Sequence, residues 1–358
     1  MSDLQQDEGA PVQRLTDKSQ PRQSLSSWLI GRPLPTADAP HQTIGKGVGL
    51  AVFASDALSS TAYATQEILF ILAGAGTAAF VYAFPISIVI VLLLAIVTLS
   101  YEQIIHAYPG GGGAYIVARD NLGELPAQTA SAALLTDYVL TVAVSISSGV
   151  AQIVSAFPAL YDYRVWISVG LVSFVMLINL RGVKESGSTF AIPTYFFLVT
   201  MVLTVGLGLF KAATGTLGSV VNPPTLETLH TTGAVGLFLL LHAFSSGTTA
   251  LTGVEAISNG ITAFKEPRSR NAGTTLIWMS AILGTLFLSI TFLSGQIGAV
   301  PSEYETVISQ LTRTVFGGRG ILYLVAISAT TVILIMAANT SFADFPRLSA
   351  LVAADGFL

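Results

Sequence analysis

Eight apolar stretches of about the length needed to cross a bilayer constrain this chain more than any other feature. A transmembrane helix needs about 20 mostly apolar residues. Backbone groups in lipid must form hydrogen bonds within their own segment, so these stretches are predicted to be helices. Of the 358 residues, 52% are hydrophobic and only 10% are charged, against about 25% charged in soluble domains. The predicted spans are residues 48–74, 79–105, 127–157, 165–180, 190–213, 234–258, 273–298 and 320–342.

The basic residues predict an orientation. With residues 1–45 taken as a flexible cytosolic N-terminal tail and residues 46–358 as the transmembrane domain, most of the 16 Lys and Arg fall on the cytoplasmic side. This excess follows the positive-inside rule. We therefore expect a multi-pass plasma-membrane protein with a cytoplasmic N-terminus. The tail has no apolar core followed by a cleavage site, so no secretory signal peptide is expected.

Composition argues against several other classes of protein. The net charge is -4 and no basic stripe is present to neutralise phosphates, so no nucleic-acid partner is expected. The chain has no cysteine, which excludes disulfides, thiolate metal sites and cysteine nucleophiles. The glycine run 110–113 follows an apolar span and lacks the Lys-Ser or Lys-Thr of a phosphate loop, so it is predicted to stop a helix. No cofactor is expected.

The first and sixth spans contain polar clusters that suit an interrupted helix. Hydroxyl groups and glycines at membrane depth allow a helix to open and present backbone groups to an ion or a polar ligand. Five spans separate the starts of these two, as in an inverted repeat in which each half begins with an interrupted helix. Spacing alone leaves open two continuous helices with packing glycines. The residues expected at the interruptions are Ser55, Ser59, Ser246, Gly247 and Thr248.

Three carboxylates in separate spans point to a cation. Asp56, Asp137 and Glu255 lie in the first, third and sixth spans, and none of these three spans contains a Lys or Arg to pair with them. A charge at the bilayer centre costs at least ~2.5 kcal/mol, so such residues are paired or functional. Oxygen donors without imidazole or thiolate suit a hard cation such as Na⁺ or K⁺. The neighbouring hydroxyl groups that could complete the site belong to Tyr63, Tyr138, Thr141 and Thr252.

Several motifs resemble the amino acid-polyamine-organocation (APC) superfamily of transporters and, within it, the KimA-like branch of the KUP potassium importers. They are Ser55-Asp-Ala-Leu-Ser-Ser60, Pro109-Gly-Gly-Gly-Gly-Ala-Tyr115, Asp137-Tyr138, residues 244–259 and Phe264-Lys-Glu-Pro267. The resemblance covers about residues 45–358. It implies an all-α membrane protein with a five-plus-five inverted-repeat (LeuT-like) fold and interrupted helices 1 and 6.

The resemblance also implies a function: proton-coupled potassium uptake by a secondary active transporter that works by alternating access, and no enzyme activity. Glu255 would carry the coupling proton and Thr252 would line the ion path. A homodimer is compatible with the resemblance. The residues that would hold K⁺ are Asp56, Tyr63, Asp137, Tyr138 and Thr141. Family members have about twelve spans and often a cytosolic C-terminal domain that binds a regulatory nucleotide. With eight spans, the second repeat is expected to be incomplete and to lack a Tyr ligand of the tenth helix.

Two functions are alternatives to potassium uptake. An amino-acid or polyamine permease of the same superfamily usually binds a substrate carboxylate at the opened first helix. Asp56 would repel that carboxylate but would not repel an amine. An intramembrane aspartyl protease could use Asp56 and Asp137 as a dyad, but the Gly-any-Gly-Asp pattern is absent from the sequence.

Overall fold

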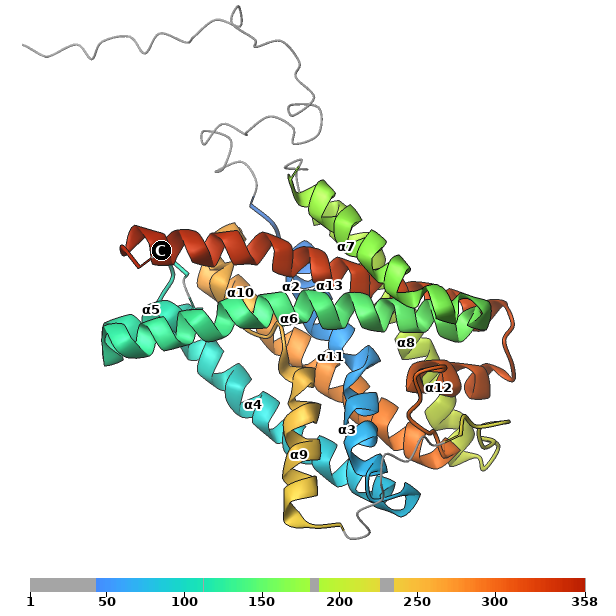
Figure 1. Cartoon of the computed structure of the whole chain (residues 1–358). Coiled ribbons are helices and arrows are strands. Elements are labelled where there is room, and N and C mark those ends of the chain that lie inside the picture. Colours follow the sequence, from blue (N-terminus) through green and yellow to red (C-terminus); the bar gives the residue numbers. More distant parts are fainter. Residues whose placement is uncertain (1–42, 112, 181–186, 226–234, 358) are drawn as a thin grey trace, which may run out of the picture.

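The computed structural model describes residues 43–111, 113–180, 187–225 and 235–357, which form a helical bundle (Figure 1). Within these ranges, strand-like pairing is confined to an isolated bridge between Ile44 and Phe264. The predicted tail, 1–45, lies outside the described residues except for its last three. The helices are α2 (Lys46–Ser59), α3 (Ala64–Ala73), α4 (Ala83–Ala107), α5 (Gly113–Leu122), α6 (Glu124–Ala156), α7 (Arg164–Leu180), α8 (Gly187–Ala213), α9 (Leu237–Gly247), α10 (Ala256–Asn259), α11 (Arg268–Ile297), α12 (Val307–Phe316) and α13 (Ile321–Ala354).

Short 3₁₀ turns connect several of these helices. They are η2 (Ser60–Ala62), η3 (Thr77–Tyr82), η4 (Pro158–Tyr163), η5 (Thr248–Leu251) and η6 (Ile261–Ala263). Two of them, η2 and η5, interrupt the first and sixth predicted spans. The other long helices run without such a break.

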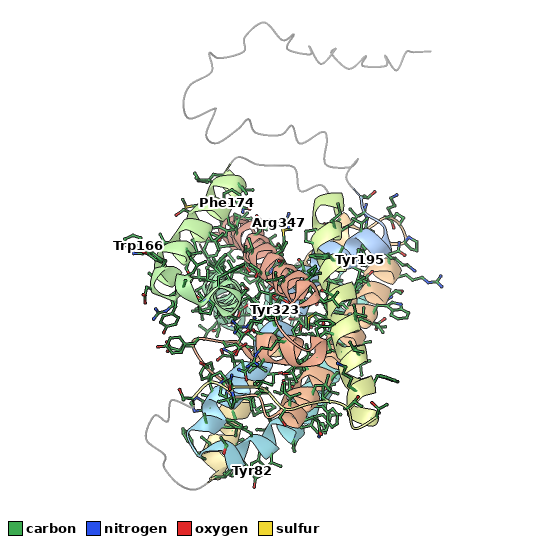
Figure 2. All side chains as sticks on the ribbon, turned by 90° about the vertical axis from the view of Figure 1, so that its right-hand side faces the viewer. Tyr82, Trp166, Phe174, Tyr195, Tyr323 and Arg347 are labelled. Atoms are coloured by element: carbon green, nitrogen blue, oxygen red, sulfur yellow. The ribbon has the colours of Figure 1, made fainter. Side chains whose placement is uncertain are left out.

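Seven segments of the described chain are long and apolar enough to cross a membrane. They coincide with seven of the eight predicted spans, and the remaining one, residues 48–74, is divided between α2 and α3. Large apolar side chains cover the outside of the bundle, as expected for a surface in contact with lipid. Trp166 and Phe174, for example, project outward from α7 (Figure 2). The seven segments are Thr77–Ala107, Glu124–Ala156, Pro158–Leu180, Ala191–Ala213, Leu237–Asn259, Arg268–Ile297 and Ile321–Ala354.

The last span is longer than predicted. The sequence prediction ended it at residue 342, whereas α13 continues to Ala354 and contains Pro346 without ending there. Polar residues such as Asn339 and Asp344 lower the local hydropathy, but several of them face other helices. The Asn339 Oδ1, for example, accepts a hydrogen bond from Asn179 Nδ2 on α7 at 2.7 Å. Polar residues that are satisfied inside a bundle do not end a membrane helix.

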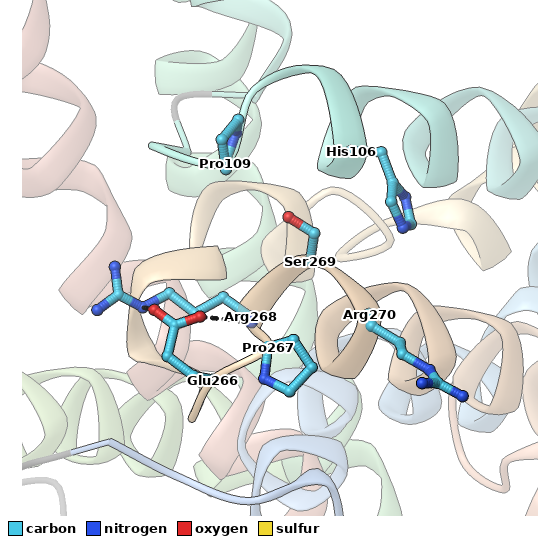
Figure 3. A pocket seen from close by; sticks show the side chains of 7 residues that line it. All are labelled: His106, Pro109, Glu266, Pro267, Arg268, Ser269 and Arg270. Carbon is cyan, nitrogen blue, oxygen red and sulfur yellow. Dashed lines mark hydrogen bonds and ion pairs between the residues drawn. The ribbon is translucent and has the colours of Figure 1, made fainter.

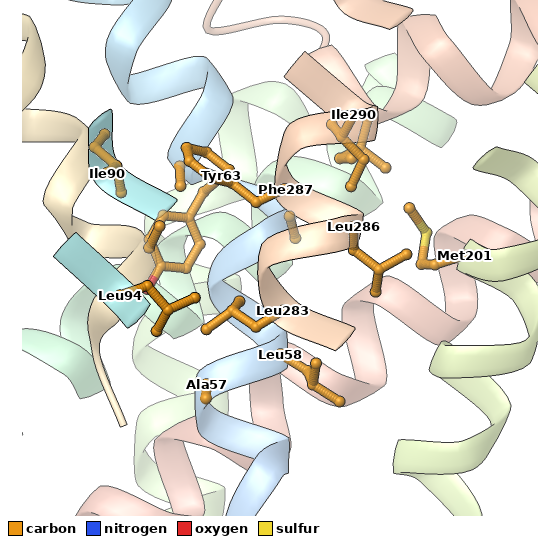
Figure 4. Close-up of a cluster of buried hydrophobic side chains, with 14 of the residues drawn as sticks. Ala57, Leu58, Tyr63, Ile90, Leu94, Met201, Leu283, Leu286, Phe287 and Ile290 are labelled. Carbon is orange, nitrogen blue, oxygen red and sulfur yellow. The ribbon is translucent and has the colours of Figure 1, made fainter. Parts of the chain in front are cut away.

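The interior of the bundle is built around α2, α3 and α11. Helix α11 packs against α4, α2 and α8, and α13 lies beside α6 along much of its length (Figure 1). The apolar core fills the space between these helices, and Leu58, Tyr63, Leu283 and Phe287 are among its members (Figure 4). The core fixes both halves of the interrupted first segment against a continuous helix. The break between α2 and α3 is therefore held in a rigid surrounding.

Candidate cation-binding site

The break in the first segment follows from its hydroxyl side chains. Ser59, Ser60 and Thr61 each donate to the backbone carbonyl three residues earlier, at distances of 2.7, 2.6 and 2.7 Å. Such local bonds compete with the α-helical backbone ladder. The chain passes through η2, and at Tyr63 the backbone leaves the helical region (φ -128°) before α3 begins. Asp56 lies one turn before this break.

The break in the sixth span centres on Gly253. Helix α9 ends at Gly247, η5 follows, and the chain turns through residues 252–255 before α10. Gly253 has a φ of +78°, which favours glycine because it lacks a Cβ. A Cβ at this position would lie 2.8 Å from the Asp56 Cγ. The two broken segments therefore meet where Asp56 faces the backbone of Gly253.

The opening in the sixth span comes later than the sequence prediction placed it. Ser246 and Gly247 still belong to α9, and Thr248 begins η5. The hydroxyl groups of Thr248 and Thr249 donate to the carbonyls three residues earlier, as in the first segment, and the backbone becomes extended only at Thr252 (ψ 143°). Gly247 is helical and packs closely against Ile68 and Ile90. In the first segment, Ser55 and Ser59 likewise lie within α2, ahead of the break.

Asp56 is the most deeply buried of the predicted carboxylates. It is 6% exposed, and within the described residues its Oδ1 has no hydrogen-bond partner. A buried carboxylate without a partner is strongly unfavourable unless a proton or a cation neutralises it. Glu255, on the turn that contains Gly253, and Asp137, on α6, are both partly exposed. Both are close enough for their charges to act on Asp56.

The predicted hydroxyl groups surround this position. The Tyr63 Oη lies 3.4 Å from the Thr252 Oγ1 and joins the two breaks. The Tyr138 Oη accepts a hydrogen bond of 3.4 Å from Asn259 Nδ2, which links α6 to the end of α10. Thr141 is buried one turn further along α6. The structure thus connects Tyr63 to Thr252 and α6 to α10, while no direct hydrogen bond joins Asp137 to another predicted residue in the described ranges.

Buried polar groups that sequence reasoning missed lie on α6, α10 and α13. The hydroxyl groups of Ser145, Ser258 and Ser341 are buried and, among the described residues, have no hydrogen-bond partner. Ser145 is four residues after Thr141, so the two share a face of α6. Asp344 on α13 acts electrostatically on Asp56 and was overlooked because the last span was ended too early. The four-residue spacing of Ser145 from Thr141 was a signal available in the sequence.

The glycine run ends α4, as predicted, and also permits a close contact. Helix α4 stops at Ala107, and Gly111 and Gly113 have positive φ values of 82° and 51°. A side chain on Gly113 would collide with that of Asn259, and one on Gly111 would meet the Asn259 carbonyl. The run therefore allows Asn259 to approach α5 and, through its bond to Tyr138, α6.

A separate hollow of about 370 Å³ opens beside the start of α11 (Figure 3). Its lining includes His106, Arg268 and Arg270 and contains none of the predicted site residues. Its one carboxylate, that of Glu266, is paired with Arg268, and Arg270 adds a further positive charge, so the lining does not suit a cation. The interrupted helices therefore remain the candidate cation site.

Broken membrane helices that meet at a buried carboxylate define a membrane protein of the permease type, and comparison with known proteins gives the family. The chain belongs to the amino acid permease family, whose model matches residues 49–358. The potassium transporter KimA of Bacillus subtilis (strain 168) is 49% identical over 335 residues, which cover 94% of this chain and 55% of KimA. The chain thus spans about half the length of this relative.

Proposed function

We propose that the chain takes part in secondary active transport of potassium across the plasma membrane. The observation that carries the proposal is the Asp56 carboxylate, which is 6% exposed and has an Oδ1 without a hydrogen-bond partner in the described chain. A dehydrated monovalent cation would supply the missing charge, and oxygen ligands suit K⁺. The 49% identity to a protein named as a potassium transporter supports the choice of ion.

In this proposal the cation is the substrate, and the predicted site residues have different roles. Asp56 and Asp137 supply negative charge, while the hydroxyl groups of Thr252 and of three further residues replace water around the ion. Glu255 carries the coupling proton, since a partly buried carboxyl on an opened helix can exchange protons with one side of the membrane. The remaining hydroxyl ligands are Tyr63, Tyr138 and Thr141.

The proposed transport cycle uses the two broken helices. Their starts are separated by five spans, which supports a five-plus-five inverted repeat. Alternating access would move one group of helices against the other around the fixed site. We assign the hinge to Gly253, because the helix is interrupted there by a backbone with a positive φ and because this backbone contacts Asp56. A cytoplasmic N-terminus follows from the distribution of basic residues.

Uptake of radioactive Rb⁺ tests the proposal. The protein is expressed in cells that lack their own potassium importers, and uptake is compared with that of the Asp56→Asn variant. We expect saturable uptake that is stimulated by an inward proton gradient and abolished by the substitution. Equal uptake by the variant would remove Asp56 from the site.

Transport of an organic cation is the second candidate. The family match is to amino acid permeases, and a negative site would accept a protonated amine while repelling a carboxylate. Thermal stability of the purified protein in K⁺, Na⁺ or a protonated polyamine separates the two, because a bound ligand stabilises the folded state by mass action. Stabilisation by K⁺ supports the first candidate, and stabilisation by the polyamine alone supports the second.

A further inference from the structure

Helix α13 presents a polar face toward the candidate site. Thr340, Ser341 and Asp344 are spaced so that they share one side of the helix. The Thr340 Oγ1 lies 3.5 Å from the Oγ of Ser55, the residue that precedes Asp56. One helical turn, about 5.4 Å, separates Thr340 from Asp344. Asp344 therefore lies one turn beyond the contact between Thr340 and Ser55, toward the end of α13 that the predicted orientation assigns to the cytoplasm.

Asp344 shares its surroundings with residues from three other segments. Its side chain is 15% exposed. Its charge acts on Asp56 of α2, Glu255 of the opened sixth span and Tyr138 of α6. A carboxylate that influences groups on all three segments lies beside the space between them. Asp344 is thus a fourth acidic residue of the region formed by Asp56, Asp137 and Glu255.

Unpartnered oxygens accompany this carboxylate. Ser341 is 1% exposed, and its Oγ has no hydrogen-bond partner among the described residues; the same holds for the Asp56 Oδ1. Buried polar atoms are normally satisfied. A hydroxyl oxygen and a carboxylate oxygen can both be satisfied by one class of ligand, a monovalent cation, which binds through oxygen lone pairs.

Arg347 already occupies one side of Asp344. Its Nη1 lies 3.0 Å from the Asp344 Oδ1, and the two residues are three apart on α13. The Arg347 side chain, labelled in Figure 2, is 63% exposed. Salt screens the charge of a guanidinium group so accessible to water, which weakens its ion pairs. The ion pair thus joins a largely buried carboxylate to a guanidinium group that is open to water.

We propose that Asp344 is a further cation-binding residue on the cytoplasmic side of the path, and that Arg347 competes with the transported cation for it. A cation leaving Asp56 would pass to Asp344, and return of Arg347 would displace it toward the cytoplasm. This inference rests on the proposed cation transport. It adds a residue and a competing ion pair that none of the sequence motifs indicated.

Rb⁺ exchange in proteoliposomes containing the purified protein tests this role. The half-saturating Rb⁺ concentration on the cytoplasmic side is measured for wild type, Asp344→Asn, Asp344→Glu and Arg347→Gln. We expect Asp344→Asn to raise this concentration about fivefold or more and Arg347→Gln to lower it by a similar factor, as for loss or gain of a partly screened charge interaction. Asp344→Glu should restore near-normal binding.

The opposite directions distinguish competition from structural support. If the ion pair only stabilised α13, removing either partner would shift the concentration in the same direction, and that result would overturn the inference. Values unchanged from wild type would also overturn it. Asp120→Asn, which changes an exposed carboxylate beside Arg119, is the matched control and should have no effect. Absence of saturable exchange in wild type, or no effect of Asp56→Asn, would instead refute the proposed transport and, with it, the role of Asp344.

Discussion

The Gly253 Cα faces the Asp56 carboxylate so closely that a Cβ at Gly253 would lie 2.8 Å from both the Asp56 Cγ and Oδ2. This contact brings the opened part of the sixth span against the last turns of α2. It depends on a residue without a side chain, in a backbone conformation with a φ of +78°. The position of the buried charge is thus fixed by the backbone of another segment.

Replacing Gly253 with Ala should therefore disturb the site more than the bundle. The positive φ costs about 1–2 kcal/mol for a residue with a Cβ, and overpacking against Asp56 adds about 1–3 kcal/mol. We expect the K⁺-dependent rise in thermal stability to be lost while the protein remains folded. Gly170→Ala is the control, since nothing lies within 4 Å of a Cβ there. An undiminished K⁺ response in Gly253→Ala would contradict the close contact.

A single hydroxyl group bridges the two breaks and gives a second prediction. The Ser60 Oγ lies 3.0 Å from the Ala250 carbonyl and shares its single proton between that carbonyl and the one of Ala57, and both Ser60 and Ala250 are buried. Ser60→Ala leaves that carbonyl without this donor, so the free energy of unfolding in mixed micelles should fall by about 1–3 kcal/mol. Ser168→Ala removes an exposed hydroxyl that bonds only within α7 and should change stability by less than about 0.5 kcal/mol. Equal effects of the two substitutions would argue against the bridge.

The sequence carried enough information to predict the spans and the two interrupted segments, because hydropathy and clusters of hydroxyl groups are local properties. It did not place the sixth opening at Thr252 to Glu255, because the winding of η5 depends on which carbonyls the threonine hydroxyl groups reach. The contact between Asp56 and Gly253 depends on how two distant segments pack. Sequence spacing alone carries no such information.

Asp344 was missed for a different reason. Polar residues near the end of α13 resemble the start of a loop when each is scored for its transfer into lipid. In the bundle, Asn339 bonds to Asn179 on α7, and Asp344 pairs with Arg347. A hydropathy scale scores each residue as if it faced lipid, whereas these side chains have protein partners. Helix ends in a membrane protein are therefore least predictable where polar residues face other helices.

A buried ion pair on the opposite side of the bundle from α5 gives a third prediction. The Arg313 Nε and Nη2 lie 2.8 and 3.1 Å from the two carboxylate oxygens of Glu305, and the side chains are 12% and 9% exposed. Glu305→Gln leaves the guanidinium group of Arg313 buried without its counter-charge, so the free energy of unfolding should fall by about 3–5 kcal/mol.

An exposed pair is the matched control for this measurement. Glu266, which is 75% exposed, pairs with Arg268 at 3.1 Å, and Glu266→Gln should cost less than about 1 kcal/mol. The free energy of unfolding of both variants is measured in mixed micelles under the same conditions. If their losses of stability were alike, the pair of Glu305 and Arg313 would not be structural.

The last prediction concerns pH and the contact between α5 and the end of α13. A hydrogen bond from the Tyr115 hydroxyl, at 2.6 Å, and then one from Arg119, also at 2.6 Å, hold the pKa of Asp355 below its ordinary value. A lowered carboxyl pKa adds stability above the unfolded-state pKa, about 3.9 for Asp. That stability is lost as the pH falls through the folded-state value.

The melting temperature of wild type should therefore exceed that of Asp355→Asn by a constant amount between about pH 5 and 8, and the difference should begin to shrink near pH 4 and vanish below the lowered pKa of Asp355. Tyr115→Phe removes the first donor and leaves Arg119, so it should reproduce part of the loss at neutral pH. Tyr82→Phe, at an exposed position (Figure 2), controls for the loss of a hydroxyl group. A difference between wild type and Asp355→Asn that persists unchanged at pH 3 would mean that the carboxylate charge does not hold α5 to α13, because Asp355 is protonated in the unfolded chain under those conditions.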